Sequence, residues 1–179
     1  MSLASFKHPH VKTTNKNYAW VLASIAEMIE ETHYHCDTFS HALRAHHNES
    51  AAQVFETLTP ALDQAFDTVM DALKNVELPR IPPWEIPHLD YDHPAPNLME
   101  RTHYLMTPVE AHQLVNDMIR THTCFFNHLL ETTQQPETQA LVKTLLQQCM
   151  HCRQDNQNAM NQAQTLPAFT DDDPPNEPH

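Results

Sequence analysis

Residues 17–47, NYAWVLASIAEMIEETHYHCDTFSHALRAHH, decide the fold of this chain. Alternating steps of four and three along this stretch meet an apolar residue at almost every position, which is typical of one long helix in a bundle. At about 1.5 Å per residue this helix is roughly 45 Å long. Thr32 and Cys36 interrupt the series at its middle and mark the place to look for function. The series is Tyr18, Leu22, Ile25, Ile29, Thr32, Cys36, Phe39 and Leu43.

The composition favours a single domain and excludes several function classes. A chain of 179 residues with 40% apolar residues can fill one sizeable core. The formal charge is -13 with only 10 Lys and Arg residues, which excludes nucleic acid as a partner because phosphate backbones need clustered cations. Gly is absent, so glycine-rich phosphate loops and dinucleotide-binding fingerprints are excluded as well.

Two further counts bear on location and chemistry. No apolar run approaches the ~18 residues that span a bilayer, and no signal peptide precedes the four cysteines. We therefore expect no membrane partner, a cytoplasmic location and reduced thiols. The 15 histidines are an excess that matters because imidazole is the commonest transition-metal ligand.

A second long helix is predicted over residues 51–76, where the same spacing recurs. Pro60 lies inside it, so we expect a kink or bulge there, because proline lacks the backbone donor and crowds the preceding turn. Prolines then crowd residues 78–97 and predict an extended connection. This crossover, residues 78–106, is long enough to run the length of a bundle, so the next helix can run parallel to the second.

The third helix is predicted to begin at Thr107-Pro108-Val109-Glu110, where threonine caps, proline takes the first position and glutamate closes a capping box. It should reach about residue 133, and Gln135-Pro136-Glu137 should start the fourth helix. Residues 1–16 read as a flexible arm, and residues 167–179 as a disordered acidic tail. The inward face of the third helix consists of Val115, Ile119, His122, Phe126 and Leu129 or Leu130. That of the fourth helix consists of Leu141 or Val142, Leu145, Cys149, Cys152, Asn156 and Ala159.

The two halves of the chain repeat each other. An offset of 87 residues places His35 on His122 and Phe39 on Phe126. The predicted fold is therefore all-α: residues 17–166 form a four-helix bundle of two helical hairpins joined by a long Pro-rich crossover.

Two short motifs accompany this arrangement of helices: Phe55-x-x-Leu58 in the second helix and Val142-x-x-Leu145 in the fourth. It resembles the ferritin-like superfamily, the rubrerythrin-like members in particular. The resemblance implies a Glu-x-x-His pair after each run, which holds two iron or manganese ions together with a glutamate from each of the first and third helices.

This chain departs from that ligand set at every position. The pairs fall on Leu62 and Ala65 and on Cys149 and Cys152, and the single glutamates fall near Thr32, beside Glu31, and on Ile119. Too few carboxylates remain to neutralise two divalent cations, so a standard di-iron centre is not expected. Two Glu-x-x-His strings do occur, but they fall outside the core, at Glu30 to His33 and Glu100 to His103.

A thiol cluster is the first candidate metal site. Cys149 and Cys152 share the inner face of the fourth helix, and Cys36 lies in the apolar series of the first. In a ferritin-like topology Cys36 approaches the height of Cys152, and His122 approaches Cys149. Such a Cys and His set suits zinc or copper ahead of iron or manganese. The alternative is that the cysteines are small apolar core residues.

A second candidate metal site lies on the outside of the first helix. His33, Asp37 and His41 are spaced four residues apart along one stripe, so neighbouring side chains can chelate a metal ion. The alternative is an ordinary solvated face. We expect the chain to form a homodimer, and an interface across this stripe would complete the ligand shell.

Three functions follow from these features. The first is a metal-binding ferritin-like protein for storage, sensing or delivery, and the second is a metal-free adaptor that acts through a protein partner. The third is a di-iron oxidoreductase that uses Glu31, His35, Glu110 and His112. A partner or dimer surface could also include Ile81, Trp84, Ile86, Tyr91, Met99, Met106 and Met118.

Overall fold

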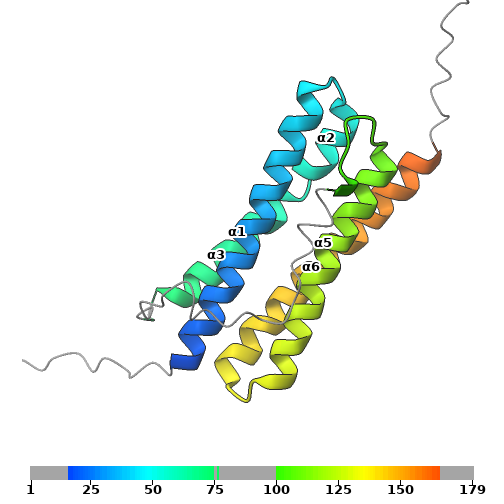
Figure 1. Ribbon diagram of the computed structural model, residues 1–179. Coiled ribbons are helices and arrows are strands. Elements are labelled where there is room, and N and C mark those ends of the chain that lie inside the picture. Colours follow the sequence, from blue (N-terminus) through cyan, green and yellow to red (C-terminus); the bar gives the residue numbers. More distant parts are fainter. Residues whose placement is uncertain (1–15, 75, 77–99, 166–179) are drawn as a thin grey trace, which may run out of the picture.

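The computed structural model describes residues 16–74, 76 and 100–165, and this part of the chain is all-helical, as predicted. Its helices are α1 (Lys16–Ala45), α2 (Glu49–Glu56), α3 (Thr59–Leu73), α5 (Pro108–Thr132) and α6 (Pro136–Thr165) (Figure 1). The acidic tail and most of the predicted arm and crossover lie outside the described residues, and so do Ile81, Trp84, Ile86, Tyr91 and Met99.

The helices pack as two antiparallel pairs. α1 contacts α2 and α3, α2 also contacts α5, and α6 contacts both α3 and α5. α1 and α6 run in one direction, while α3 and α5 run in the other (Figure 1). Thr32 of α1 meets His122 of α5, and Cys36, one turn later, meets Met118, one turn earlier. These directions are the ones that two hairpins and a crossover require, and they are compatible with the predicted four-helix bundle.

The core contains the residues that the spacing selects. In α1 the apolar series is buried from Leu22 to Leu43, including Thr32 and Cys36, and only Tyr18 at its start is half-buried. The largest fully buried side chains come from all five of these helices and include Leu22, Ile25, Ile29, Phe55, Val69, Leu114, Phe125, Phe126 and Leu145. The alternating spacing therefore identified the faces that pack together.

The predicted second helix is interrupted, and the distortion expected near Pro60 takes the form of a break between α2 and α3. The helix breaks at Thr57 and Leu58, and Pro60 lies in the first turn of α3. Proline is compatible with that position because the first backbone N–H groups of a helix have no intrahelical acceptor. Both helices keep the same buried face, so Phe55 and Leu62 lie in one core on either side of the break.

A tight corner joins α1 to α2. α1 ends at Ala45, two residues before its predicted end near His47. The His47 N–H donates to the Arg44 carbonyl (2.9 Å), and the Asn48 N–H donates to the Leu43 carbonyl (2.9 Å). This is a Schellman motif, and His47 takes its left-handed position with φ of 62°. Glycine usually occupies that position, and histidine adopts it here in a chain that has no glycine.

Asn48 connects this corner to the start of α5. Its Oδ1 accepts from the Ala51 N–H (3.3 Å) and caps α2. Its Nδ2 donates to the carbonyls of Tyr104 (3.0 Å) and Met106 (2.7 Å). One side chain therefore fixes the position of α2 relative to the segment that enters α5.

We expect Asn48→Ala to lower the free energy of unfolding by about 2 kcal/mol, because it removes a helix cap and two hydrogen bonds to backbone carbonyls. Urea unfolding followed by circular dichroism measures this loss. Asn158→Ala is the matched control, since Asn158 is exposed and, within the described residues, its side chain bonds only Gln154 of the same helix. Equal stability of the two variants would mean that Asn48 does not connect the segments.

The predicted capping box at the start of α5 is confirmed. The Thr107 Oγ1 accepts from the Glu110 N–H (3.2 Å), and the Glu110 carboxylate accepts from the Thr107 N–H (2.7 Å). The hydrogen bonds from Thr107 hold the pKa of Glu110 below its ordinary value. Pro108 occupies the first helical position, as expected.

Corresponding positions of the two halves have similar environments. His35 and His122 are both buried, and each contacts the phenylalanine four residues later, with ring centroids 5.8 Å apart for His35 and Phe39 and 6.1 Å apart for His122 and Phe126. This agrees with the predicted internal repeat. The polar partners differ, because His35 pairs with Glu31 on its own helix whereas His122 bonds Thr32 on α1.

Candidate functional site

A small cavity lies between α1, α3, α5 and α6, where the core is interrupted by polar and sulfur-containing side chains. It has a volume of about 30 Å³, which is enough for a single water molecule or ion. We call it the inner cavity. Its lining includes Thr32, Leu62, Ala65, Met118, Ile119, His122, Gln148, Cys149 and Cys152.

Three of the four cysteines gather around the inner cavity. Cys149 and Cys152 line it, whereas Cys36 is fully buried beside it, with its Sγ 3.8 Å from the Sδ of Met118. Cys152 is near enough to the other two to influence their ionisation. All four cysteines are free thiols. The structure therefore brings Cys36 toward Cys152 from the opposite hairpin, as the topology predicted.

Burial keeps these thiols protonated at neutral pH. Desolvation is the largest cause in each case and raises the pKa of Cys36 to about 12, that of Cys149 to about 12 and that of Cys152 to about 11. Asp37 and Cys152 add to the effect on Cys36, and Asp155 adds to the effect on Cys152. A metal ion at this site would have to displace thiol protons.

The hydrogen bonds around Thr32 define the tautomer of His122. The Thr32 hydroxyl donates to the Met28 carbonyl (2.9 Å), so its oxygen can only accept from His122. The His122 Nε2 lies 2.7 Å from that oxygen and must therefore carry a proton. In the neutral ring, Nδ1 then carries the lone pair. A histidine that ligates a metal usually donates its other ring N–H to an acceptor in this way.

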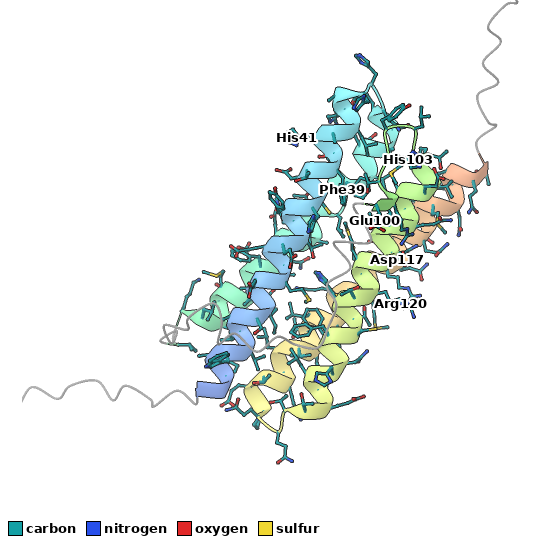
Figure 2. All side chains as sticks on the ribbon, viewed as in Figure 1. Phe39, His41, Glu100, His103, Asp117 and Arg120 are labelled. Carbon is teal, nitrogen blue, oxygen red and sulfur yellow. The ribbon has the colours of Figure 1, made fainter. Side chains whose placement is uncertain are left out.

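The predicted outer stripe does not come together. His33 lies 3.5 Å from Asp63 of α3, and the Nδ1 of His41 lies 2.8 Å from the backbone carbonyl of Asp37. His41 lies on the outward side of α1, whereas Phe39 faces the other helices (Figure 2). Across the described ranges, no three His, Cys, Asp or Glu side chains are close enough to hold a metal ion as they stand. This holds for the inner set as well as for the outer stripe.

The residues named for a di-iron oxidoreductase are separated in the structure. His35 lies 3.7 Å from Glu31, Glu110 belongs to the capping box, and His112 bonds Asn156. No carboxylate is found among the described residues that line the inner cavity. The two Glu-x-x-His strings lie outside the core as predicted, since Glu30, Glu100 and His103 are exposed and His33 is half-buried.

Sequence reasoning missed a second and larger hollow. A groove of about 1420 Å³ opens between α2 and α6, and the start of α5 forms its floor. The His112 Nδ1 lies 2.7 Å from Asn156 Oδ1 at this floor, and the Asn156 Nδ2 donates to the His112 carbonyl (3.0 Å). Both residues are buried. The available signal was a histidine and an asparagine on otherwise apolar faces of the third and fourth helices.

Searches against protein-family models, curated proteins and solved structures found no match for this chain. Within the described residues, every helix is too short or too polar to cross a membrane.

The raised thiol pKa values predict a dependence of stability on alkaline pH. A group whose pKa is higher in the folded state stabilises that state fully below its unfolded pKa, near 9, and loses the contribution as pH rises toward the folded value, near 12. Between pH 8 and pH 10 a thiol ionises in the unfolded state but stays protonated in the folded state. We therefore expect the free energy of unfolding to fall by about 1 kcal/mol for each buried thiol. Urea unfolding of wild type and Cys36→Ala at both pH values measures this, and an equal decrease in the two proteins would contradict it.

Proposed function

We propose that this chain is a ferritin-like four-helix bundle in which a soft-metal site of cysteine, methionine and histidine takes the place of the di-iron centre. The observation that carries the proposal is the lining of the inner cavity. Cys149 and Cys152 stand where the resemblance puts a Glu-x-x-His pair, and Met118 and His122 line the same cavity from α5. Cys36 completes the set from α1.

Cuprous copper is the ion that suits these side chains best. Thiolate and thioether sulfur select monovalent copper, whereas iron and manganese in such bundles rely on carboxylates. The described lining of the inner cavity offers sulfur and one imidazole, without a carboxylate. Zinc remains the next candidate, because a Cys and His set also suits it.

Charge balance also favours a monovalent ion. A buried site is stable only when its net charge is small, because an uncompensated charge in an apolar interior is costly. One thiolate neutralises a cuprous ion, so only one of the buried thiols needs to lose its proton. A divalent ion requires two thiolates, and the pKa of every thiol at the site is raised by burial.

The inner cavity and the groove share part of their lining. Cys152, Gln148, Leu58 and Ala61 line both the inner cavity and the outer groove. We infer that an ion enters the inner cavity from the groove past the Cys152 thiol, which borders both spaces. Slow exchange through one thiol is suited to storage or delivery of a metal ion in a reducing compartment such as the cytoplasm.

Anaerobic titration of the metal-free protein with cuprous ion, in competition with bicinchoninate, tests the proposal. We expect one tightly bound copper per chain and at least one proton released per copper, measured with a pH indicator at low buffer concentration. Parallel titrations with zinc and ferrous ion should give weaker binding. A protein that binds none of the three, and whose melting temperature is the same with and without chelator, would instead be the metal-free adaptor. The predicted homodimer is checked by analytical ultracentrifugation of the same samples.

A further inference from the structure

The groove owes its shape to the break in the second helix. α2 packs on α1 and α5, whereas α3 packs on α1 and α6. The chain changes direction at Thr57 and Leu58. As a result, α2 does not cover the C-terminal half of α6, whose side chains line the groove. The hollow that results is lined by side chains of α2, α3, α5 and α6 and is mostly apolar.

At the floor of the groove, the bonding of Asn156 fixes the tautomer of His112. The Asn156 amide group donates to the His112 carbonyl, so its oxygen is the atom that faces the ring. An amide oxygen only accepts, and the His112 Nδ1 must therefore be the protonated nitrogen. In the neutral ring, Nε2 carries a lone pair. That nitrogen has no hydrogen-bond partner among the described residues, although only 6% of the His112 surface is exposed.

Gln148 supplies a second acceptor without a donor. Its Nε2 donates to the Thr68 hydroxyl (3.2 Å), which directs its Oε1 elsewhere. That oxygen is buried and has no partner in the described part of the chain. Gln148 lies two helical turns before Asn156 on α6, about 12 Å along the axis. An unpaired buried acceptor is costly, so Gln148 Oε1 calls for a donor from a ligand, and His112 Nε2 is a further acceptor in the lining of the groove.

The charges that line the groove favour a cation. Of the described residues around it, Asp155 is the one carboxylate, beside Asn156, and there is no Lys or Arg. The whole chain carries a formal charge of -13. An anionic ligand would face hydrogen-bond acceptors and a negative charge. An ammonium group, in contrast, can donate a hydrogen bond to His112 Nε2 or to Gln148 Oε1.

We propose that the groove binds a linear aliphatic diamine, with one ammonium group at His112 Nε2 and the other at Gln148 Oε1. The methylene chain between them would lie along the apolar lining near Leu58 and Val115. This site is separate from the proposed copper site, although Cys152 and Gln148 border both.

Calorimetric titration of the full, metal-free chain with three linear probes tests the proposal. Each probe has a chain of about eight carbon atoms. The probes are octane-1,8-diamine, n-octylamine and octanoate. We expect saturable binding of one diamine per chain, about 10-fold tighter than octylamine because a second charge-assisted hydrogen bond is made, and little binding of octanoate. Diamine that binds no tighter than octylamine, octanoate that binds as well as either, or a complete lack of saturable binding would overturn it.

Two pairs of variants locate the ends of the ligand. Gln148→Leu should abolish the 10-fold preference for diamine over octylamine, and Gln154→Leu, exposed on the same helix and outside the groove, should keep it. His112→Phe should weaken the binding of both amines, while His41→Phe on the outer face of α1 should leave it unchanged. The probe comparison on wild-type protein and the Gln148 pair remain decisive if His112→Phe fails to fold. Unchanged diamine binding in Gln148→Leu would overturn the proposal.

Discussion

Replacement of both Cys149 and Cys152 by serine is expected to weaken cuprous copper binding by about 100-fold or more. A serine hydroxyl is close in size to a thiol but is a hard ligand that binds cuprous copper poorly. Both residues line the inner cavity, so the variant leaves Cys36 as the one thiol beside it. Competition with bicinchoninate under anaerobic conditions measures the change in affinity. A smaller accompanying loss of stability is expected, because two half-buried sulfur atoms are exchanged for more polar oxygen.

Cys124→Ser is the matched control for this double variant. Cys124 is half-buried on α5 and is not part of the inner cavity. We expect it to bind copper with wild-type affinity and stoichiometry. Equal affinity of the wild-type protein and the double variant would mean that the inner site is wrong, and the cysteines would then be core residues.

Phe55→Ala is expected to lower the free energy of unfolding by about 3 to 5 kcal/mol. Phe55 is fully buried, and its ring centroid lies 5.4 Å from that of Phe39 on α1. α2 has 8 residues, too few to be stable as an isolated helix, so its position depends on this packing. Chemical unfolding at pH 7 measures the loss.

Phe66→Ala provides the comparison, since Phe66 is half-buried on α3 and should cost clearly less. If the Phe55 variant loses under 1 kcal/mol, α2 is not held by its aromatic side chain. Amide protection over residues 49–56 in the same variant would show whether α2 detaches alone.

The fold was largely predictable because one periodicity governs it. Helices with a single buried face keep their apolar residues in register over many turns, so α1, α5 and α6 could be predicted, α5 together with its capping box. The same periodicity did not show that the distortion expected at Pro60 would be a break between α2 and α3. Phe55, Leu58 and Leu62 keep the helical spacing across it, and spacing alone does not tell a proline inside a helix from one in a first turn.

The sequence predicted the candidate site only where the directions of the helices decide which residues lie at the same height. Because α1 and α6 run in the same direction, Cys36 of α1 lies near the height of Cys152 of α6, and this match follows from topology. The partners of His33 and His41 do not follow, because Asp63 belongs to another helix and the Asp37 carbonyl competes with side chains for His41. The groove was equally hidden, since it depends on the angle at which α2 leaves α3.

Asn48 has a consequence for how the molecule opens. The same residue ends α1 through its backbone, begins α2 through its side-chain oxygen and holds the entry to α5 through its amide group. These contacts share one side chain and one turn of backbone, so the loss of one of them weakens the others. Local unfolding at this end of the molecule should therefore be cooperative, with the α1–α2 corner and the first turn of α5 opening as one unit.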